Sequence, residues 1–344
     1  MKHFIFTGAC YVDTILSVPF FPGEDDKLRA TAAQVRRGGN CPNSIEVLQQ
    51  LLKSLGQDKG KGQGNDVATY LIACLPARDA PTTAMIANSF GNTSPEIAAP
   101  NLDLCIYRDG HTSPASSYIL RSAATGSRTI VNHSDLPEMT ADEFREVADW
   151  FFDSHPVSEN TPVSSWWHFE GRIPETTLKC IKHLISRRNT NNNVTISVEV
   201  EKPGREGLRD LAALADVVFY SKTWAESEGY DSAEACLCGE AASLPQASLL
   251  LCTWGAKGAA ALVPGSGGSI VNCPASPVPA ANVVDAVGAG DTFVAGILYK
   301  LSAVGRQHKS TRLDIDDDTA RDALTFAVGL ATRKIQMDGF QGLA

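Results

Sequence analysis

The sequence predicts a doubly wound α/β domain with helices on both faces of its sheet. Short apolar runs rich in β-branched and aromatic residues alternate along the chain with amphipathic segments of helical period. Glycine-rich turns stand at two of the junctions where a strand passes into a helix. A chain of 344 residues, 43% of them hydrophobic, can bury a large core. We therefore expect residues 1–344 to form one domain that also carries a small separate sheet.

Composition excludes several classes of partner. The net charge of −9 and a pI near 5.3 argue against nucleic acid or an anionic membrane surface. No apolar run approaches the length of a membrane span, and the apolar start at residues 4–6 is too short for a signal peptide. The nine cysteines, an odd number, favour free thiols over a disulfide framework. The expected location is the cytoplasm.

The first strand is expected over residues 4–11, with Asp13 at its end. Ligand groups of an open α/β sheet collect where strands end, so Asp13 is a candidate for contacts with hydroxyl groups. A turn before Pro19 explains the same residue equally well.

A helix is predicted after residue 44, because Ile45, Leu48 and Leu52 share one face. Residues 57–66 are polar and glycine-rich, which is typical of a surface loop. Beyond this loop we expect a strand over residues 67–74 and a helix over residues 82–90.

A small sheet apart from the main core is predicted in the first third of the chain. Residues 118–131 show a strand, turn, strand pattern, and residues 27–31 are expected to join it.

The remaining elements alternate in the same way. Thr140 and Glu143 form a capping box, and the acidic residues 316–318 precede a helix. His168, in an apolar strand, is expected to be a hydrogen-bonded core histidine. The other predicted elements are strands at residues 166–172, 194–203 and 216–220, a strand, turn, strand unit at 249–259, and a helix at 323–335.

Residues 283–293 pass from a loop into a helix, since Phe293, Ile297 and Leu301 recur at a spacing of four. The glycine-rich turn at residues 288–290 lets backbone N–H groups approach a ligand, and a helix N-terminus attracts phosphate. Asp291 would face that phosphate, which suits a base that takes a proton from an attacking hydroxyl. A turn whose aspartate caps the helix is the alternative.

A second glycine-rich turn at residues 36–44 has the chemistry of a polyol site. Gly38 and Gly39 allow close approach of the backbone, and the amides of Asn40 and Asn43 both donate and accept hydrogen bonds. The alternative is a simple turn with Asn43 or Ser44 as helix N-cap.

Together the two turns resemble the PfkB/ribokinase family of carbohydrate kinases. Residues 285–291, Asp-Ala-Val-Gly-Ala-Gly-Asp, are similar to the family signature Asp-Thr-x-Gly-Ala-Gly-Asp, with Ala286 in place of threonine. The turn at residues 38–43 is similar to the family's sugar-binding Gly-Gly-x-x-x-Asn, in the Gly-Gly-Asn form of ketohexokinases. The resemblance implies a ribokinase-like fold and phosphorylation of a sugar hydroxyl by ATP and Mg²⁺, with K⁺ as a further candidate ion.

The resemblance also implies roles for residues. Asp291 would be the catalytic base, and Gly288, Ala289 and Gly290 would form an anion hole. The sugar would be held by Asp13, Gly38, Gly39, Asn40, Asn43 and Asp291, and the nucleotide by Arg128, Trp254, Gly255, Gly258, Gly288 and Gly290.

The magnesium ligands stay unassigned by the resemblance. Ser221 and Trp224 stand where ribokinases carry Asn-x-x-Glu, while Ser221-Lys222 is similar to ketohexokinases. Glu199 and Glu201, at the end of a predicted strand, are candidates for the region of metal and phosphate. Residues 11–34 and 104–133 would supply a lid sheet over the sugar, through which such kinases often form a homodimer.

The substrate is left open by the sequence. A ketohexose such as fructose is favoured, ribose is the first alternative, and a nucleoside is the second because Tyr11, Phe20 and Phe21 offer aromatic stacking partners. A sugar-binding sensor without turnover is a third alternative, motivated by Ala286 and the missing Asn-x-x-Glu.

Overall fold

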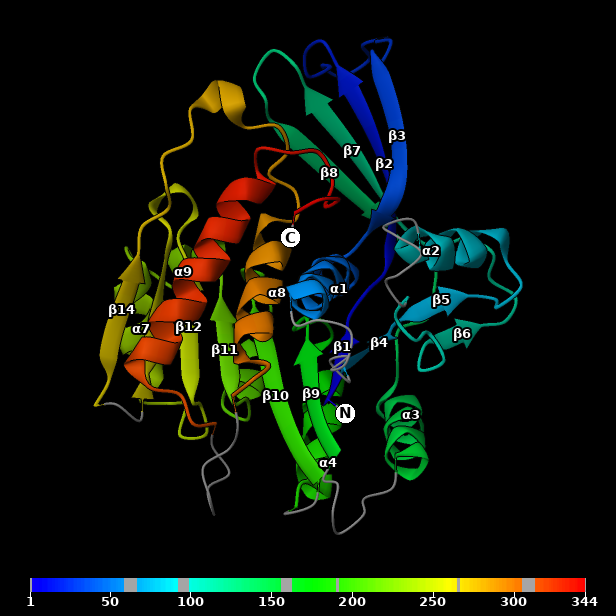
Figure 1. Cartoon of the computed structure of the whole chain (residues 1–344). Coiled ribbons are helices and arrows are strands. Elements are labelled where there is room, and N and C mark those ends of the chain that lie inside the picture. Colours follow the sequence, from blue (N-terminus) through cyan, green and yellow to red (C-terminus); the bar gives the residue numbers. More distant parts are fainter. Residues whose placement is uncertain are drawn as a thin grey trace.

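A computed structural model describes residues 2–58, 67–91, 99–155, 163–189, 192–264, 267–304 and 313–343. Its main sheet has the strand order β14-β13-β12-β11-β10-β9-β1-β4 (Figure 1). Neighbours from β4 to β12 pair in parallel, and β13 and β14 add antiparallel strands at one edge. The strands are β1 (Lys2–Thr7), β4 (Val67–Ile72), β9 (Val163–Phe169), β10 (Asn192–Val200), β11 (Val217–Tyr220), β12 (Leu249–Thr253), β13 (Ala259–Val263) and β14 (Ser269–Cys273).

Both faces of this sheet are covered by helices, as predicted for a doubly wound fold. Alternate residues of a strand point to opposite faces, so Phe4 and Trp166 join one apolar cluster while Ile5 and Trp167 join the other. The first face packs against α1 (Asn40–Asp58), α8 (Ala289–Leu301) and α9 (Asp317–Lys334). The second packs against α3 (Ala141–Ser154), α4 (Pro174–Arg187), α5 (Leu208–Ala212), α6 (Lys222–Ser227) and α7 (Ala233–Ala241).

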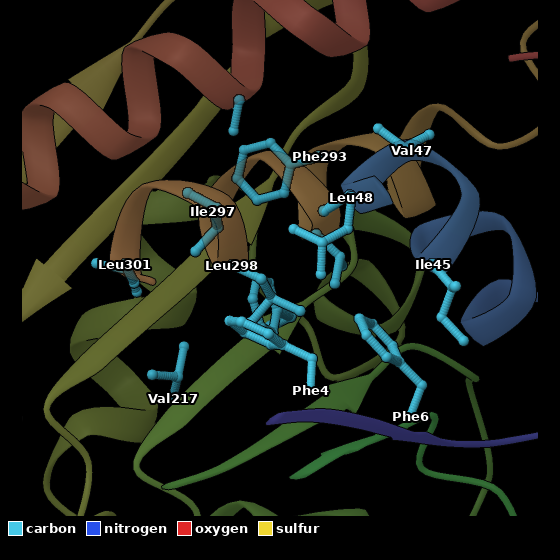
Figure 2. Packing of buried hydrophobic residues seen from close by; sticks show 14 of the residues in the cluster. Phe4, Phe6, Ile45, Val47, Leu48, Val217, Phe293, Ile297, Leu298 and Leu301 are labelled. Atoms are coloured by element: carbon cyan, nitrogen blue, oxygen red, sulfur yellow. The ribbon is translucent and has the colours of Figure 1, made fainter. Parts of the chain in front are cut away.

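Helix α8 lies at the centre of the first face, between α1 and α9 (Figure 1). Phe293, Ile297 and Leu301 point into the core, as their spacing predicts, and belong to the same buried cluster as Leu48 of α1 and Phe4 of β1 (Figure 2). The packing against α9 depends on Gly296, where an added Cβ would lie 3.0 Å from the Ala327 Cα.

The small sheet projects beyond the main one (Figure 1) and has the order β3-β2-β7-β8. Strand β2 pairs in parallel with β7 and antiparallel with β3, and β7 and β8 are antiparallel. The strands are β2 (Tyr11–Val18), β3 (Ala32–Gly38), β7 (Ala115–Ser122) and β8 (Arg128–His133), while β5 (Cys74–Pro76) and β6 (Ile106–Arg108) pair separately beside α2 (Pro81–Gly91).

Two expectations about the start of the chain are wrong. The first strand ends at Thr7, and the chain re-enters a strand only at Tyr11, in the small sheet. Asp13 therefore lies inside β2 and not at the end of a main-sheet strand. Residues 27–31 form no strand, because the partner of β2 is β3.

Helix starts follow local chemistry, with one exception. Thr140 and Glu143 form the predicted capping box, and the Asp316 carboxylate caps α9 by accepting from the Thr319 N–H. Helix α1, however, starts at Asn40, so Asn43 and Ser44 lie within the helix and neither is its N-cap. This helix also runs to Asp58, into the predicted loop at residues 57–66, whose last eight residues lie outside the described part of the chain.

Within the described ranges, no helix combines the length and the apolar character that crossing a membrane would require.

We predict that Ile297→Ala lowers the free energy of unfolding by about 2–5 kcal/mol. Ile297 is fully buried between α1, α9 and the sheet, so truncation removes apolar contacts and leaves a cavity. Urea denaturation followed by circular dichroism measures the effect. The matched control is Ile130→Ala on the exposed β8, which should change stability by less than about 0.5 kcal/mol. Equal effects at the two sites would contradict the central position of α8.

Candidate active site

A cavity of about 430 Å³ lies between the small sheet and the carboxyl ends of the main-sheet strands. Residues at or just beyond the ends of β9 to β12 line it: Glu170, Arg172, Glu199, Glu201, Ser221 and Thr253. The small sheet contributes Tyr11, Asp13, Ser117, Arg128 and Asn132, and the first turns of α1 and α8 contribute Asn40, Asn43 and residues 288–291. An open α/β sheet binds its ligands at this edge.

The N-terminus of α8 points into this cavity. Gly288 is the N-cap with a φ of 80°, and an added Cβ would collide with the ring of Phe340, so glycine is required on both grounds. The N–H groups of the first helical turn have no intrahelical acceptor, and the positive end of the helix dipole lies there. This turn can therefore bind an anion.

Asp291, in the third position of α8, is held in place by hydrogen bonds from α1. The Asn43 amide donates to the Asp291 Oδ2 at 2.7 Å, and the Ser44 hydroxyl donates to its backbone carbonyl at 3.1 Å. Burial raises the pKa of Asp291 well above its usual range, and the nearby Glu199 carboxylate adds to the rise while the hydrogen bond from Asn43 opposes it. A raised pKa makes this carboxylate a stronger proton acceptor than an exposed aspartate.

Three glutamates surround Asp291. Burial and the charge of Glu199 raise the pKa of Glu170 to about 7, although the Ala9 N–H donates to it. Burial and the charge of Glu201 raise the pKa of Glu199 to about 8. The Asn40 amide joins the two strand-end carboxylates, donating to Glu201 at 3.0 Å and to Glu199 at 3.4 Å.

Behind this cluster, His168 is fully buried and bonded on both ring nitrogens, as expected of a core histidine. Nδ1 lies 2.8 Å from the Ser197 hydroxyl and Nε2 lies 3.1 Å from Glu199 Oε1. Burial lowers the pKa of His168 to about 3, so the ring is neutral.

The loop before α8 is held by a buried ionic cluster. The Val287 N–H donates to Asp285 Oδ1 at 2.9 Å, while Lys334, which is fully buried, and Arg36 both donate to Oδ2. Burial acts to raise the pKa of Asp285, but the hydrogen bond from Val287 and the charges of Lys334 and Arg36 lower it overall. Because Arg36 belongs to β3, this cluster ties the small sheet to the anion-binding turn.

A second cavity, of about 620 Å³ and mainly apolar lining, adjoins the first. Gly255, Gly258, Val278, Val328 and Ala331 are among its lining residues. Its lining shares five residues with the first cavity: Thr253, Ala286, Ala289, Gly290 and Phe293. The first turn of α8 therefore separates a polar cavity from a largely apolar one.

Comparison with known proteins agrees with this arrangement. The family model described as pfkB family carbohydrate kinase matches residues 95–342. The chain belongs to that family. Mouse ketohexokinase is 29% identical over 346 aligned residues, which cover 99% of each protein.

Solved structures of pfkB-type kinases share the fold of this kinase. Giardia lamblia ribokinase superposes with a TM-score of 0.72 at 14% identity, over 99% of this chain and 95% of that one. Arabidopsis thaliana ribokinase, solved with ribose and ATP, gives a TM-score of 0.67 at 18% identity, over 98% and 93%. The ribokinase-like fold predicted from the sequence is confirmed.

The structure brings most of the predicted residues of this carbohydrate kinase together. Asp13, Gly39, Asn40, Asn43, Arg128 and residues 288–291 line the first cavity, and Gly255, Gly258 and Gly290 line the second. Gly38 lines neither, but an added Cβ there would overlap the Asp13 carboxylate, so Gly38 makes room for Asp13.

Two predicted residues are placed differently. The Trp254 ring is buried in the apolar cluster on the far face of the sheet and lines neither cavity, with Lys222 over it. The Asn43 amide is bonded to Asp291 and to Arg37, so its first role is to hold another side chain.

Several polar residues of the cavity have no role predicted from the sequence, among them Ser117, Glu170 and Arg172. Ser117 faces Asp13 across β2 and β7, and Glu170 and Arg172 follow β9. The Glu-Gly-Arg run after a buried strand was the available signal for the last two, but nothing local showed that Ser117 would face the same cavity.

The carboxylates of this kinase fit a divalent cation. Glu199 and Glu201 point polar oxygens toward the cavity, and mutual repulsion raises the pKa of Glu199, a repulsion that a hard cation would relieve. Ser221 and Trp224 do not fit that role, because the Ser221 hydroxyl caps α6 and the Trp224 ring is buried.

We predict that the contribution of Glu199 to stability is lost as pH rises from 4.5 to about 8. The lowered pKa of His168 acts in the opposite direction up to pH 6.5, so the effect of Glu199 is isolated by comparing the wild type with Glu199→Gln. The pKa of Glu199 is 4.5 when exposed and about 8 in the fold, so its favourable contribution is complete below pH 4.5 and is lost across this range. Glu199→Gln should reduce the loss by about 1 kcal/mol or more, since one pKa unit corresponds to about 1.4 kcal/mol.

Urea denaturation at a series of pH values, without added metal, measures this dependence. The matched control is Glu146→Gln on the exposed face of α3, which should follow the wild-type profile. A Glu199→Gln profile identical to the wild type would show that this carboxylate is not held in its uncharged form.

Proposed function

We propose that this kinase transfers the γ-phosphoryl group of ATP to a hydroxyl of a ketohexose such as fructose. The observation that supports the proposal most directly is the place of the α8 N-terminus, which presents Asp291 and an anion-binding turn where a polar and an apolar cavity meet. Two substrates bound in these cavities would bring their reacting atoms to that turn.

In this mechanism Asp291 is the catalytic base. Its carboxylate takes the proton of the sugar hydroxyl as that oxygen forms a bond to the γ-phosphorus, and the bond from phosphorus to the β-phosphate oxygen breaks to release ADP. Its raised pKa favours proton uptake, and Asn43 and Ser44 fix its position. The N–H groups at residues 288–290 stabilise the charge of the transferring group.

The polar cavity would hold the sugar. Asp13 is buried beside Ser117 and faces the hydroxyls of a ligand, and Asn40, Gly39 and Asn43 supply amide and backbone groups from the start of α1. These groups would hold the sugar hydroxyl in line with the phosphorus, and such positioning raises the rate of the transfer.

The apolar cavity would hold the adenine, between the turn at Gly255–Gly258 and helix α9. Arg128, whose guanidinium suits phosphate oxygens, lines the polar cavity from β8. Mg²⁺, when bound near Glu199 and Glu201, would neutralise charge on the phosphates. K⁺ is a candidate activator to be tested in the same assay.

The small sheet would act as a lid that excludes water from the transfer and as the surface of a homodimer. Val35, Tyr118 and Val131 expose apolar side chains on the face of this sheet away from the polar cavity, which favours burial against a second copy. The lid is linked to the anion-binding turn through Arg36 and Asp285.

The preference for a ketohexose rests on the full-length similarity to mouse ketohexokinase and on Ser221-Lys222 in place of Asn-x-x-Glu. Tyr11, proposed above as a stacking partner for a nucleoside, accepts a hydrogen bond from Arg172 at 2.9 Å, so its hydroxyl is held within the protein. The ring of Tyr11 lines the polar cavity and can still stack on a base, so a nucleoside stays the second alternative.

We predict that Asp291→Asn lowers kcat by about 10²- to 10⁴-fold, because the proton acceptor is lost. The variant should fold, bind both substrates, and unfold at a higher temperature than the wild type at pH 7, because a carboxyl group whose pKa is raised by folding lowers stability at a pH above its ordinary pKa. Steady-state kinetics and thermal unfolding measure the two effects.

The matched control for this variant is Asp322→Asn, on the exposed face of α9, where kcat should stay within twofold of the wild type. Turnover of Asp291→Asn close to the wild-type rate would remove Asp291 as the base.

The substrate is tested by ADP release from the purified protein with MgATP and fructose, ribose or adenosine, with and without K⁺. We expect turnover with fructose at a kcat/KM at least tenfold above the others. A preference for ribose or adenosine would keep the transfer mechanism and reject the ketohexose. Thermal stabilisation by a sugar without any ADP release would support the sensor alternative.

A further inference from the structure

Three potential metal ligands of different chemistry meet beneath the floor of the polar cavity. Cys41 lies in the first turn of α1, His168 in β9 and Glu199 in β10, and their ligand atoms all lie within 4.8 Å of one another. The first two are completely buried, and Glu199 is 7% exposed on the cavity side. Among the described residues this is the one such group of three that was found.

The arrangement is close to that of a tetrahedral ion site. The His168 Nε2 and Glu199 Oε1 atoms are 3.1 Å apart, and bond lengths of about 2.0–2.3 Å around a tetrahedral zinc place neighbouring ligand atoms about 3.3–3.6 Å apart. The Cys41 sulfur lies within 4.8 Å of both other ligand atoms and would be the third ligand. The fourth position, open on the Glu199 side, reaches the cavity, which gives the ion an entry path.

A second observation is that the surrounding residues fix these ligands. The Ser197 hydroxyl contacts His168 Nδ1 at 2.8 Å and the Trp166 indole N–H at 2.8 Å, so the ring presents Nε2 toward Glu199. Gly8, just after β1, leaves room for the thiol: an added Cβ would lie within 2.7 Å of both the Cys41 sulfur and the Glu170 carboxylate. The Glu170 carboxylate therefore lies close to the Cys41 sulfur.

We propose that Cys41, His168 and Glu199 bind a borderline-soft divalent cation of the Zn²⁺ type. Thiolate and imidazole select Zn²⁺ or Co²⁺ over Mg²⁺, so this site differs from any hard-cation site at the outer oxygens of Glu199 and Glu201. Binding would release the thiol proton of Cys41, because the thiolate is the form that binds metal.

The bound ion would cross-link three elements of the fold. It joins the first turn of α1 to β9 and β10, beside Asn40, whose amide bridges Glu199 and Glu201 at the cavity. An ion that binds only the folded state raises its stability in proportion to the logarithm of its concentration above Kd.

The test is a titration of the metal-free full-length protein with Co²⁺. We expect one equivalent to give the charge-transfer absorption of a cobalt–thiolate bond, to be displaced by Zn²⁺ and to persist in excess Mg²⁺. Zn²⁺ should also raise the melting temperature of the wild type. Neither readout requires turnover, so the outcome is independent of the proposed kinase activity.

Two variants locate the site. Cys41→Ala should lose the absorption band and the thermal shift, whereas Cys238→Ala, which removes an exposed thiol on α7, should keep both. Glu199→Gln preserves hydrogen bonding to His168 and should weaken Co²⁺ binding at least tenfold while leaving the thiolate band at saturation.

The proposal is overturned if the wild type shows no thiolate band, or if the band persists unchanged in Cys41→Ala. Should Cys41→Ala fail to fold, as judged by circular dichroism, Glu199→Gln decides: unchanged Co²⁺ affinity in that variant excludes the site.

Discussion

The hydrogen bond from the Asn43 amide to the Asp291 carboxylate joins the two halves of the active site. It is 2.7 Å long, is fully buried and connects residues 248 positions apart. With the bond from Ser44 to the Asp291 carbonyl, it fixes the first turn of α8 against α1, so neither helix start can move without disturbing the other. The packing of Phe293 and Ile297 beneath this turn holds the same two helices together (Figure 2).

The cost of this arrangement is electrostatic. Asp291, Glu170 and Glu199 are buried close together, and their raised pKa values express the energy needed to charge them there. The buried pair of Lys334 and Asp285 shows a mixed balance. Burial acts to raise the pKa of the Asp285 carboxyl group, but the Val287 N–H and the charge of Lys334 lower it overall, whereas burial lowers the pKa of Lys334 itself.

Attachment of the small sheet follows from the same ionic cluster. Arg36 of β3 donates to Asp285, and Asp13 of β2 lies opposite Arg36 in the neighbouring strand. A movement of this sheet would therefore displace Asp13 in the polar cavity and also the loop before α8.

The sequence by itself determined the features that depend on neighbouring residues. The α/β alternation, the glycine turn at Gly288, the capping box at Thr140 and the amphipathic face of α8 arise from spacing and backbone conformation over a few residues, and all are present. The resemblance to the family rests on two such local motifs, because few backbone conformations allow N–H groups to come close to a phosphate or a sugar.

Only the tertiary structure decided which distant residues meet. Asp13 belongs to the small sheet because the chain leaves the main sheet at Thr7, and the Asn43 amide is used on Asp291 because α1 packs on α8. Trp254 points into the apolar cluster on the far face of the sheet because it continues the alternation of β12, whose Leu250 and Cys252 point the same way. Cys41, His168 and Glu199 come together from three different elements. Such contacts depend on the order of strands in the sheet and on helix packing, which local sequence does not encode.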